Sequence, residues 1–251
     1  MRVALVTGAS KGVGKGIALE LGRAGFAVAV NYNSDQPGAA ATVTEISNAG
    51  GQAAAIQANV GLSADVQRMF TELDATFGRV DCLVNNAGVQ TWSPLLDLKE
   101  EDWDRVIDTN LKGTFLCTQQ AGRRMKETGG GSIVNIGSGC NKWAFPKLVD
   151  YTASKGGIEQ FTKSAAIELG KFRIRVNCVA PGAIEVERTK EEGGDYVALW
   201  SKEAPLGRIG VPEDVAHMVA FLASEKADFV TGQTIWVDGG VFSRPTWPYG
   251  L

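Results

Sequence analysis

The alternation of short apolar runs with helix-patterned segments is the feature that most constrains how this 251-residue chain can fold. Seven runs are predicted strands, namely Val3–Val6, Ala27–Val30, Ala53–Ile56, Cys82–Val84, Ile133–Ile136, Ile174–Val179 and Thr234–Val237. They contain few polar residues, as expected for strands covered on both faces. Six helices are predicted between them, at Gly14–Ala24, Gly38–Asn48, Ala64–Thr76, Glu101–Lys126, Tyr151–Leu169 and Pro212–Ala223. This order predicts an α/β fold with a doubly wound, seven-stranded parallel sheet and helices on both faces.

No linker divides the chain, so residues 1–251 are expected to form one domain. Two stretches interrupt the alternation. The first, around residues 183–205 (Ala183–Pro205), is rich in charge and follows the sixth predicted strand. Ligands bind beyond the carboxyl ends of such strands, so we interpret this stretch as a substrate lid, with a solvated loop as the alternative. The second, Phe242–Leu251, carries aromatic residues that either dock on a neighbouring subunit or pack on their own domain.

Composition excludes several classes of function. Hydrophobic residues make up 44% of the chain and charged residues 21%, which permits a sizeable buried core. The net charge is −3 and the basic residues are scattered, so neither nucleic acid nor membrane is expected as a partner. No stretch reaches the roughly 20 apolar residues that span a bilayer, and the first apolar run is too short for a signal peptide. We therefore expect a cytoplasmic protein.

Metal and disulfide chemistry are not expected. The four cysteines are spread without a C-x-x-C pair, and they are Cys82, Cys117, Cys140 and Cys178. The single histidine, His217, lies in an amphipathic helical pattern and is interpreted as structural. The sequence therefore predicts neither a metal site nor a Ser-His-Asp hydrolase.

A glycine-rich loop, T-G-A-S-K-G-V-G at residues 7–14, joins the first predicted strand to the first helix. Gly8, Gly12 and Gly14 free the backbone to approach a pyrophosphate, and the helix N-terminus adds N–H groups and a positive dipole. The spacing differs from G-x-G-x-x-G, and no G-K-[ST] follows that would indicate an NTP-binding loop. The loop predicts a dinucleotide site that also includes Ser10, Lys11 and Val13.

The end of the second predicted strand is expected to select the cofactor. Asn31, Tyr32 and Asn33 occupy it, so no carboxylate stands there to hold a bare ribose 2′-hydroxyl. Lys11 in the glycine-rich loop is expected to reach a 2′-phosphate. These residues favour NADP(H), and the nearby Asp35 keeps NAD(H) possible.

Tyr151 and Lys155 are four residues apart, so they share one face of a predicted helix. A phenol is a poor base at its ordinary pKa of about 10. A neighbouring ammonium in a water-poor cleft lowers such a pKa, and a tuned phenol can exchange a proton with an alcohol. Ser138, thirteen residues upstream of Tyr151, is expected to hold the substrate oxygen.

Several motifs together resemble the short-chain dehydrogenase/reductase family over essentially the whole chain. The family's T-G-x-x-x-G-x-G corresponds to Thr7–Gly14 and its N-N-A-G to Asn85–Gly88. Its helix asparagine resembles Asn110, and its P-G after the sixth strand resembles Pro181–Gly182. The resemblance implies a Rossmann-type domain and an NAD(P)-dependent enzyme that interconverts a small-molecule alcohol and a carbonyl. Its catalytic residues would be Asn110, Ser138, Tyr151 and Lys155.

The resemblance also implies roles for individual residues. Tyr151 would be the acid/base, Lys155 would also bind the nicotinamide ribose, and Asn110 would hold a water in a proton relay. Further cofactor contacts are implied at Asn59, Val60, Asn86, Ala87, Gly88, Pro181, Gly182 and Ile184. Two residues depart from the family pattern. Asn59 stands where Asp is more common, and Gly137 stands where Ser is common.

The substrate remains open at this level. Similarity to bacterial glucose 1-dehydrogenases makes oxidation of an aldose at C1 the leading interpretation. Reduction of a 3-oxoacyl group on acyl carrier protein is the second, and a non-catalytic cofactor-binding scaffold is an alternative of another class. The resemblance further implies a homotetramer. The apolar helices 101–126 and 151–169 would form one interface, and the last strand with Trp247–Tyr249 would form another.

Overall fold

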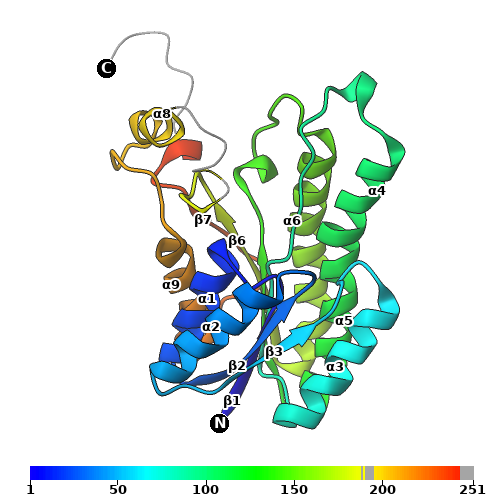
Figure 1. Cartoon of the computed structure of the whole chain (residues 1–251). Coiled ribbons are helices and arrows are strands. Elements are labelled where there is room, and N and C mark those ends of the chain that lie inside the picture. Colours follow the sequence, from blue (N-terminus) through cyan, green and yellow to red (C-terminus); the bar gives the residue numbers. More distant parts are fainter. Residues whose placement is uncertain (188, 190–194, 244–251) are drawn as a thin grey trace.

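A computed structural model describes residues 1–187, 189 and 195–243 of the chain (Figure 1). Seven strands, all paired in parallel, form one sheet in the order β3-β2-β1-β4-β5-β6-β7. The strands are β1 (Arg2–Val6), β2 (Phe26–Tyr32), β3 (Ala53–Gln57), β4 (Cys82–Asn85), β5 (Gly131–Ile136), β6 (Ile174–Pro181) and β7 (Thr234–Val237). The predicted fold class is confirmed, and each predicted strand lies within one of these.

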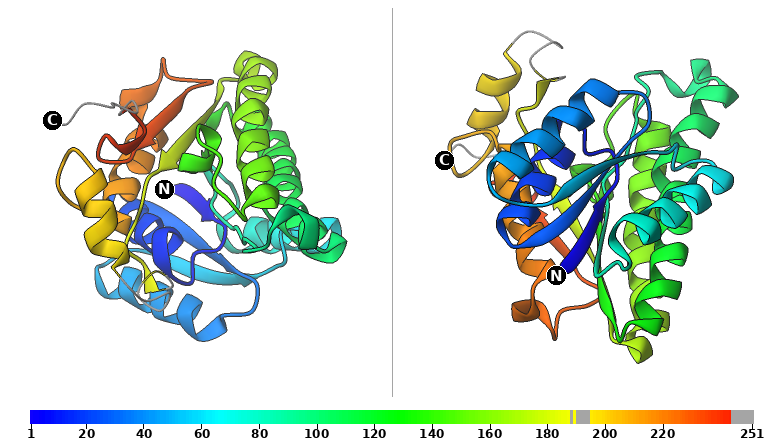
Figure 2. Two further views of the ribbon diagram at one scale, coloured as in Figure 1. Left: turned by 90° about the horizontal axis from the view of Figure 1, so that it is seen from above. Right: turned by 60° about the horizontal axis from the view of Figure 1, so that its bottom comes forward.

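Helices cover both faces of the sheet. One face packs against α1 (Gly12–Arg23), α2 (Gln36–Asn48) and α9 (Pro212–Ala223). The other packs against α3 (Ser63–Phe77), α5 (Gly113–Glu127) and α6 (Val149–Leu169) (Figure 2). Because strand side chains alternate between faces, the apolar runs divide between the two cores.

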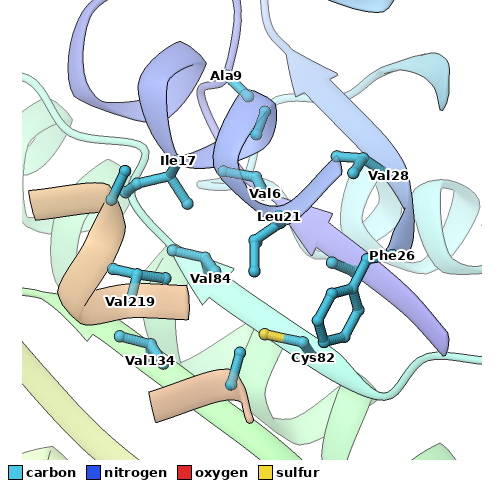
Figure 3. Packing of buried hydrophobic residues seen from close by; sticks show 14 of the residues in the cluster. Val6, Ala9, Ile17, Leu21, Phe26, Val28, Cys82, Val84, Val134 and Val219 are labelled. Atoms are coloured by element: carbon cyan, nitrogen blue, oxygen red, sulfur yellow. The ribbon is translucent and has the colours of Figure 1, made fainter. Parts of the chain in front are cut away.

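The core beneath α1 and α9 shows this packing directly. Side chains from β1, β4 and β5 meet those of the two helices around Val6, Val84 and Val134 (Figure 3). Ile17 and Leu21 come from α1, four residues apart on its inner face. Both helices are therefore fixed against the middle of the sheet.

The expectation that every strand is covered on both faces is wrong for the two edge strands. In β3 only Ile56 is fully buried, and all four residues of β7 are partly exposed. Each edge strand has a neighbour on one side only, so the helical layers cover it less completely. The central strands β1 and β4 follow the prediction, with every residue after Arg2 buried.

The predicted helix Glu101–Lys126 is also different in detail. The structure has α4 (Glu100–Ile107), a π-helical turn η2 (Asp108–Lys112) and then α5. The π turn contains Asn110, whose buried side chain binds groups outside this helix. A period of 3.6 residues cannot reveal such a turn, which inserts one residue into the helical ladder.

Strand order reverses at β1, whose neighbours are β2 on one side and β4 on the other. Ligands of doubly wound sheets bind beyond the carboxyl ends of the strands at such a point. That edge is at the top of Figure 1, where α4 and a short helix, α8 (Tyr196–Glu203), lie on opposite sides. Within the described residues, no helix is long and apolar enough to cross a bilayer.

Candidate active site

The glycine-rich loop is tied to the segment that follows β4. The Thr7 hydroxyl accepts hydrogen bonds from the backbone N–H groups of Asn86 (2.9 Å) and Ala87 (3.0 Å). The Asn86 amide donates in return to the carbonyls of Thr7 (2.9 Å) and Gly8 (3.0 Å). The two segments expected to hold the cofactor thus form one rigid unit. Thr7 had been assigned no function beyond its place in the motif.

The loop has the shape that a pyrophosphate requires. A Cβ on Gly14 would lie 2.3 Å from the Gly8 carbonyl oxygen and 2.4 Å from the Asn86 amide nitrogen, so only glycine fits. Gly8 itself has a φ of +62°, a left-handed conformation that glycine adopts freely. The N-terminus of the 12-residue helix α1 faces the same point and favours an anion. These residues fit a dinucleotide cofactor.

Asn31, predicted to contact the cofactor, instead supports the loop. Its side chain is buried, and its amide oxygen accepts from the Gly8 N–H at 3.1 Å. Its amide nitrogen donates to the carbonyls of Ile56 and Ala58, each at 3.2 Å. The amide oxygen and the amide nitrogen of Asn31 are therefore both hydrogen-bonded within the chain. Asn31 fixes the turn of the glycine-rich loop relative to β2 and β3.

The charged groups expected near the end of β2 are Asp35 and Lys11. Asp35 caps α2 by accepting from the Gly38 N–H at 3.1 Å, which commits its carboxylate to the helix start. Lys11 is exposed, and its ammonium makes no hydrogen bond or ion pair with the described part of the chain. The Lys11 ammonium is thus available to an anion, while the Asp35 carboxylate is occupied by the N-terminus of α2.

On the adenine side, Asn59 and Val60 follow β3. The Asn59 side-chain oxygen accepts from the Gly61 N–H at 3.0 Å. The acceptor by which Asn was expected to replace the family's Asp is therefore turned toward its own loop. Val60 is buried against Gly113.

Tyr151 and Lys155 lie one turn apart on α6, with the Lys155 ammonium 5.5 Å from the centre of the Tyr151 ring. The ammonium donates to the Ile136 carbonyl at 2.7 Å, which fixes α6 against the end of β5. Burial lowers the pKa of Lys155 to about 8. A desolvated cation beside a phenol is the arrangement that the sequence predicted.

Ser138 begins the short turn η3 (Gly139–Asn141) after β5. Its hydroxyl oxygen accepts from the Cys140 N–H at 3.2 Å, and its own N–H donates to the Asn141 side chain at 2.8 Å. Neither contact uses the hydroxyl proton, although the Ser138 side chain also interacts with the Cys140 thiol. The turn also explains Gly137, because a Cβ there would lie 2.8 Å from the Cys178 sulfur.

Ser138, Tyr151 and Lys155 line one cleft with a volume of about 780 Å³. The cleft also contains Val13 and the predicted cofactor residues Asn86, Gly88, Pro181, Gly182 and Ile184. The structure therefore brings the catalytic group and the cofactor segments together at the carboxyl ends of β1, β4, β5 and β6.

Asn110 lies behind this cleft and is fully buried. Its amide oxygen accepts from the Val89 N–H at 2.8 Å, and its amide nitrogen donates to the Val89 carbonyl at 2.9 Å and the Ser154 hydroxyl at 3.0 Å. Ser154 in turn donates to the Tyr151 carbonyl at 2.7 Å. The Asn110 side chain thus joins the segment after β4 to the catalytic helix, and its water-relay role stays a prediction.

Sequence reasoning missed an aromatic group on one side of the cleft. Phe145, Trp200 and Phe242 line it, and Tyr196 lies beside Trp200 on α8. No pattern in the sequence distinguished these residues from ordinary core aromatics. They come from three distant segments that meet only in the folded chain. The most charged part of the predicted lid, residues 188 and 190–194, lies outside the described residues, as does Trp247–Tyr249.

The four cysteines are free thiols and are buried. Burial raises the pKa of Cys82 and of Cys117 to about 12, and that of Cys178 to about 11. These thiols stay protonated at neutral pH, so they are poor nucleophiles.

Comparison with known proteins shows the family to which this chain belongs. A family model described as enoyl-(acyl carrier protein) reductase matches residues 8–242. The chain belongs to the short-chain dehydrogenase/reductase family. A 3-oxoacyl-[acyl-carrier-protein] reductase of Staphylococcus epidermidis is 45% identical over 239 residues, covering 95% of this chain and 98% of that protein. The 3beta-hydroxysteroid dehydrogenase 1 of Eggerthella lenta is 41% identical over 252 residues, covering 99% and 97%.

A solved structure of the same family is similar along nearly its full length. The gluconate 5-dehydrogenase of Burkholderia cenocepacia, in complex with NADP and tartrate, superposes with a TM-score of 0.91 at 34% identity. The match covers 97% of this chain and 96% of that one. The chain is therefore an NAD(P)-dependent oxidoreductase of the short-chain type, acting between an alcohol and a carbonyl. The scaffold alternative is set aside.

Proposed function

We propose that this enzyme is an NADP(H)-dependent reductase of 3-oxoacyl thioesters. The observation that carries the proposal is the lining of the cleft beside Ser138 and Tyr151. It contains Phe145, Trp200 and Phe242, and no Asp or Glu among the described residues. An aldose presents a hydroxyl on almost every carbon, so its site needs several polar partners. The aromatic part of the lining offers few of them, and Gln90 and Arg105 come from the segment after β4 and from α4. The 45% identity to a 3-oxoacyl-[acyl-carrier-protein] reductase supports the same substrate class.

The catalytic residues act on the substrate oxygen. When bound, the nicotinamide cofactor supplies the reducing equivalent to the carbonyl carbon. Ser138 donates a hydrogen bond to the carbonyl oxygen, holding it beside Tyr151 as negative charge develops. Tyr151 gives its phenolic proton to that oxygen, which completes the alcohol. Lys155 stabilises the phenolate that remains.

The cofactor proposal rests on charge. Gly8, Gly12 and Gly14 would hold the pyrophosphate against the N-terminus of α1, and Lys155 would reach the nicotinamide ribose. Lys11 would pair with the 2′-phosphate, because a cation and a phosphate form a charge-assisted hydrogen bond that a bare hydroxyl cannot match. The Asp35 carboxylate is committed to the start of α2. NADP(H) is therefore favoured over NAD(H).

One absorbance experiment tests the substrate class. The purified enzyme is mixed with NADPH and acetoacetyl thioester, and in parallel with NADP⁺ and glucose, while nucleotide absorbance is followed. We expect consumption of NADPH in the first mixture and no formation in the second. Tyr151→Phe is the control for enzyme-dependent turnover. Glucose oxidation without thioester reduction would replace this proposal by the aldose interpretation.

A further inference from the structure

We propose that Phe145, Trp200 and Phe242 form an aromatic wall that limits the length of the carbon chain accepted beyond the substrate carbonyl. This inference rests on the proposed reduction of 3-oxoacyl substrates and adds a selection among them. The enzyme would take short chains, and longer ones would meet the wall.

The three rings close one side of the cleft that contains Ser138 and Tyr151. Phe145 contacts Trp200 edge-on with 6.3 Å between ring centres, and it contacts Phe242 in the same manner at 6.4 Å. Such spacings are those of touching aromatic pairs, so no alkyl chain passes between the rings. The wall therefore joins three separate segments: the loop after β5, helix α8 and the chain that follows β7.

Phe242 is the fixed part of this wall. Only 4% of its surface is exposed, and its N–H donates to the Asp238 carboxylate at 2.8 Å. Its carbonyl accepts from the Lys142 ammonium at 2.6 Å. The ring lies directly on Gly139, where a Cβ would be only 2.0 Å from it. Because Gly139 follows Ser138, the base of the wall is set against the residue expected to hold the carbonyl.

Further aromatic residues support the wall from behind. Trp143 packs edge-on against Phe242 at 5.0 Å between ring centres, and Trp236 of β7 packs against it at 5.8 Å. Tyr196 packs against Trp200 at 6.3 Å on α8. Aromatic pairs of this kind stabilise one another beyond the area that they bury. A long acyl chain cannot displace Phe242 without breaking these contacts.

The opposite side of the cleft is where a bulky carrier would leave. Gln90, Trp92 and Arg105 line the cleft from the segment after β4 and from α4, which lies across this edge of the sheet from α8 (Figure 1). Of the Trp92 surface, 58% is exposed. A carrier attached through a thioester is far larger than the cleft, so it has to remain on this outer side. The carbon chain beyond the carbonyl then points inward, toward the aromatic wall.

Chain-length selectivity tests the wall. We would measure NADPH-dependent kcat/KM for the C4 and C8 3-oxoacyl thioesters of N-acetylcysteamine. For the wild-type enzyme we expect the C8 value to be at least tenfold below the C4 value. The C8-to-C4 ratio should rise at least tenfold in Trp200→Ala, because removal of the indole opens space. Trp200→Phe retains a ring and should keep the wild-type ratio within about threefold.

The matched control is Phe229→Ala, a change at a fully exposed aromatic residue outside the cleft, which should leave the ratio unchanged. If the wild-type enzyme has equal kcat/KM values for C4 and C8, the proposed length limit is wrong. It is also wrong if Trp200→Ala leaves the C8-to-C4 ratio unchanged. If no thioester is reduced, the proposed substrate is wrong. The length limit is then tested with the ratio of kcat/KM for 2-octanone to kcat/KM for 2-butanone. A wild-type ratio near one, or reduction of neither ketone, would show that the aromatic wall does not limit chain length.

Discussion

The one chemical task proposed for Tyr151 is the transfer of a proton to or from the substrate oxygen. We predict that Tyr151→Phe lowers kcat by about 10³-fold or more, since a positioned acid/base contributes about 10² to 10⁴ and no other group here can replace it. Cofactor affinity should stay within a few-fold because the ring is retained. Steady-state kinetics and a cofactor titration check both expectations. A variant with a tenth of wild-type activity would refute the assignment.

Lys155 is predicted to act on Tyr151 through its charge. Without the ammonium the phenolate is less stable, so Lys155→Met should move the alkaline limb of the pH–rate profile upward and weaken cofactor binding. The measurement is kcat/KM for carbonyl reduction between pH 6 and pH 11, since Tyr151 acts there as the acid and its pKa sets the alkaline limb. A profile that keeps its shape and position would show that the electrostatic role is wrong.

The same variant has a signature in stability. Burial lowers the pKa of folded Lys155 to about 8, from 10.5 in the unfolded chain. Below pH 8 both states are protonated, and the cost of burying the charge is constant. Between pH 8 and pH 10.5 Lys155 loses its proton in the folded state and keeps it in the unfolded state. The free energy of unfolding therefore rises with pH, by up to about 3 kcal/mol. Urea unfolding at pH 7 and pH 10 should show that rise for the wild type relative to Lys155→Met.

Lys11 decides the cofactor preference if the charge argument is correct. Lys11→Ala should weaken NADP(H) binding by about tenfold or more, because a hydrogen bond to a charged group contributes about 1.5–3 kcal/mol. NAD(H) binding should change little. Lys15→Ala is the matched control, since that ammonium is already paired with Glu45 at 2.6 Å. Equal losses of both cofactors in Lys11→Ala would remove this residue from the argument.

At the scale of single residues, the sequence predicted site residues where the spacing along the chain alone brings them close together. Tyr151 and Lys155 lie four apart on a helix, and Gly8, Gly12 and Gly14 lie in the short stretch that joins β1 to the start of α1. Asn31 was predicted as a cofactor contact, which stays a prediction; its support of the loop was not predicted, because its partners come from β3 and from the loop after β1. Phe242 was not predicted, since only tertiary folding places it on Gly139.

Among the secondary-structure elements, the π turn at Asp108–Lys112 has the clearest consequence. It lets the Asn110 side chain face Val89 and Ser154 instead of its own helix. Asn110→Ala would leave the partly buried Val89 N–H and the buried Ser154 hydroxyl without this partner. We predict a fall in the free energy of unfolding of about 2–3 kcal/mol, on the scale of 1–3 kcal/mol for each unsatisfied buried group.

Activity should fall in Asn110→Ala as well, because the segment after β4 loses its link to α6. Denaturant unfolding and steady-state kinetics measure the two effects. Gln119→Ala, an exposed change on α5, is the control and should affect neither. Unchanged stability in Asn110→Ala would mean that the hydrogen bonds of this turn contribute nothing.

Helices and strands were predicted where hydrophobic periodicity is regular, and the errors occurred where a local pattern carries no information. The π turn preserves the apolar face of the helix on both sides, so the sequence reads as one helix. Incomplete coverage of β3 and β7 depends on their place at the edges of the sheet. Strand order is a property of the assembled fold, which single runs do not contain.

For the whole molecule, the question is what covers the outer sides of α4, α5 and α6. Some apolar residues of these helices pack inside their own chain, since Val106 and Ile158 are buried. Trp103, Phe115 and Ile167 remain 37%, 43% and 83% exposed. Large apolar side chains in these positions indicate a surface for another subunit.

We therefore predict a homotetramer with two-fold axes, built from dimers that pair these helices. Light scattering at micromolar concentration should give four times the chain mass. Phe115→Glu should lower that mass, because it places a carboxylate in an apolar contact without a partner. Gln67→Glu adds the same charge at an exposed position of α3, outside these three helices, and controls for charge alone. A monomer mass for the wild type would refute the assembly. A stable dimer would refute only the second interface, which was assigned to β7 and the tail.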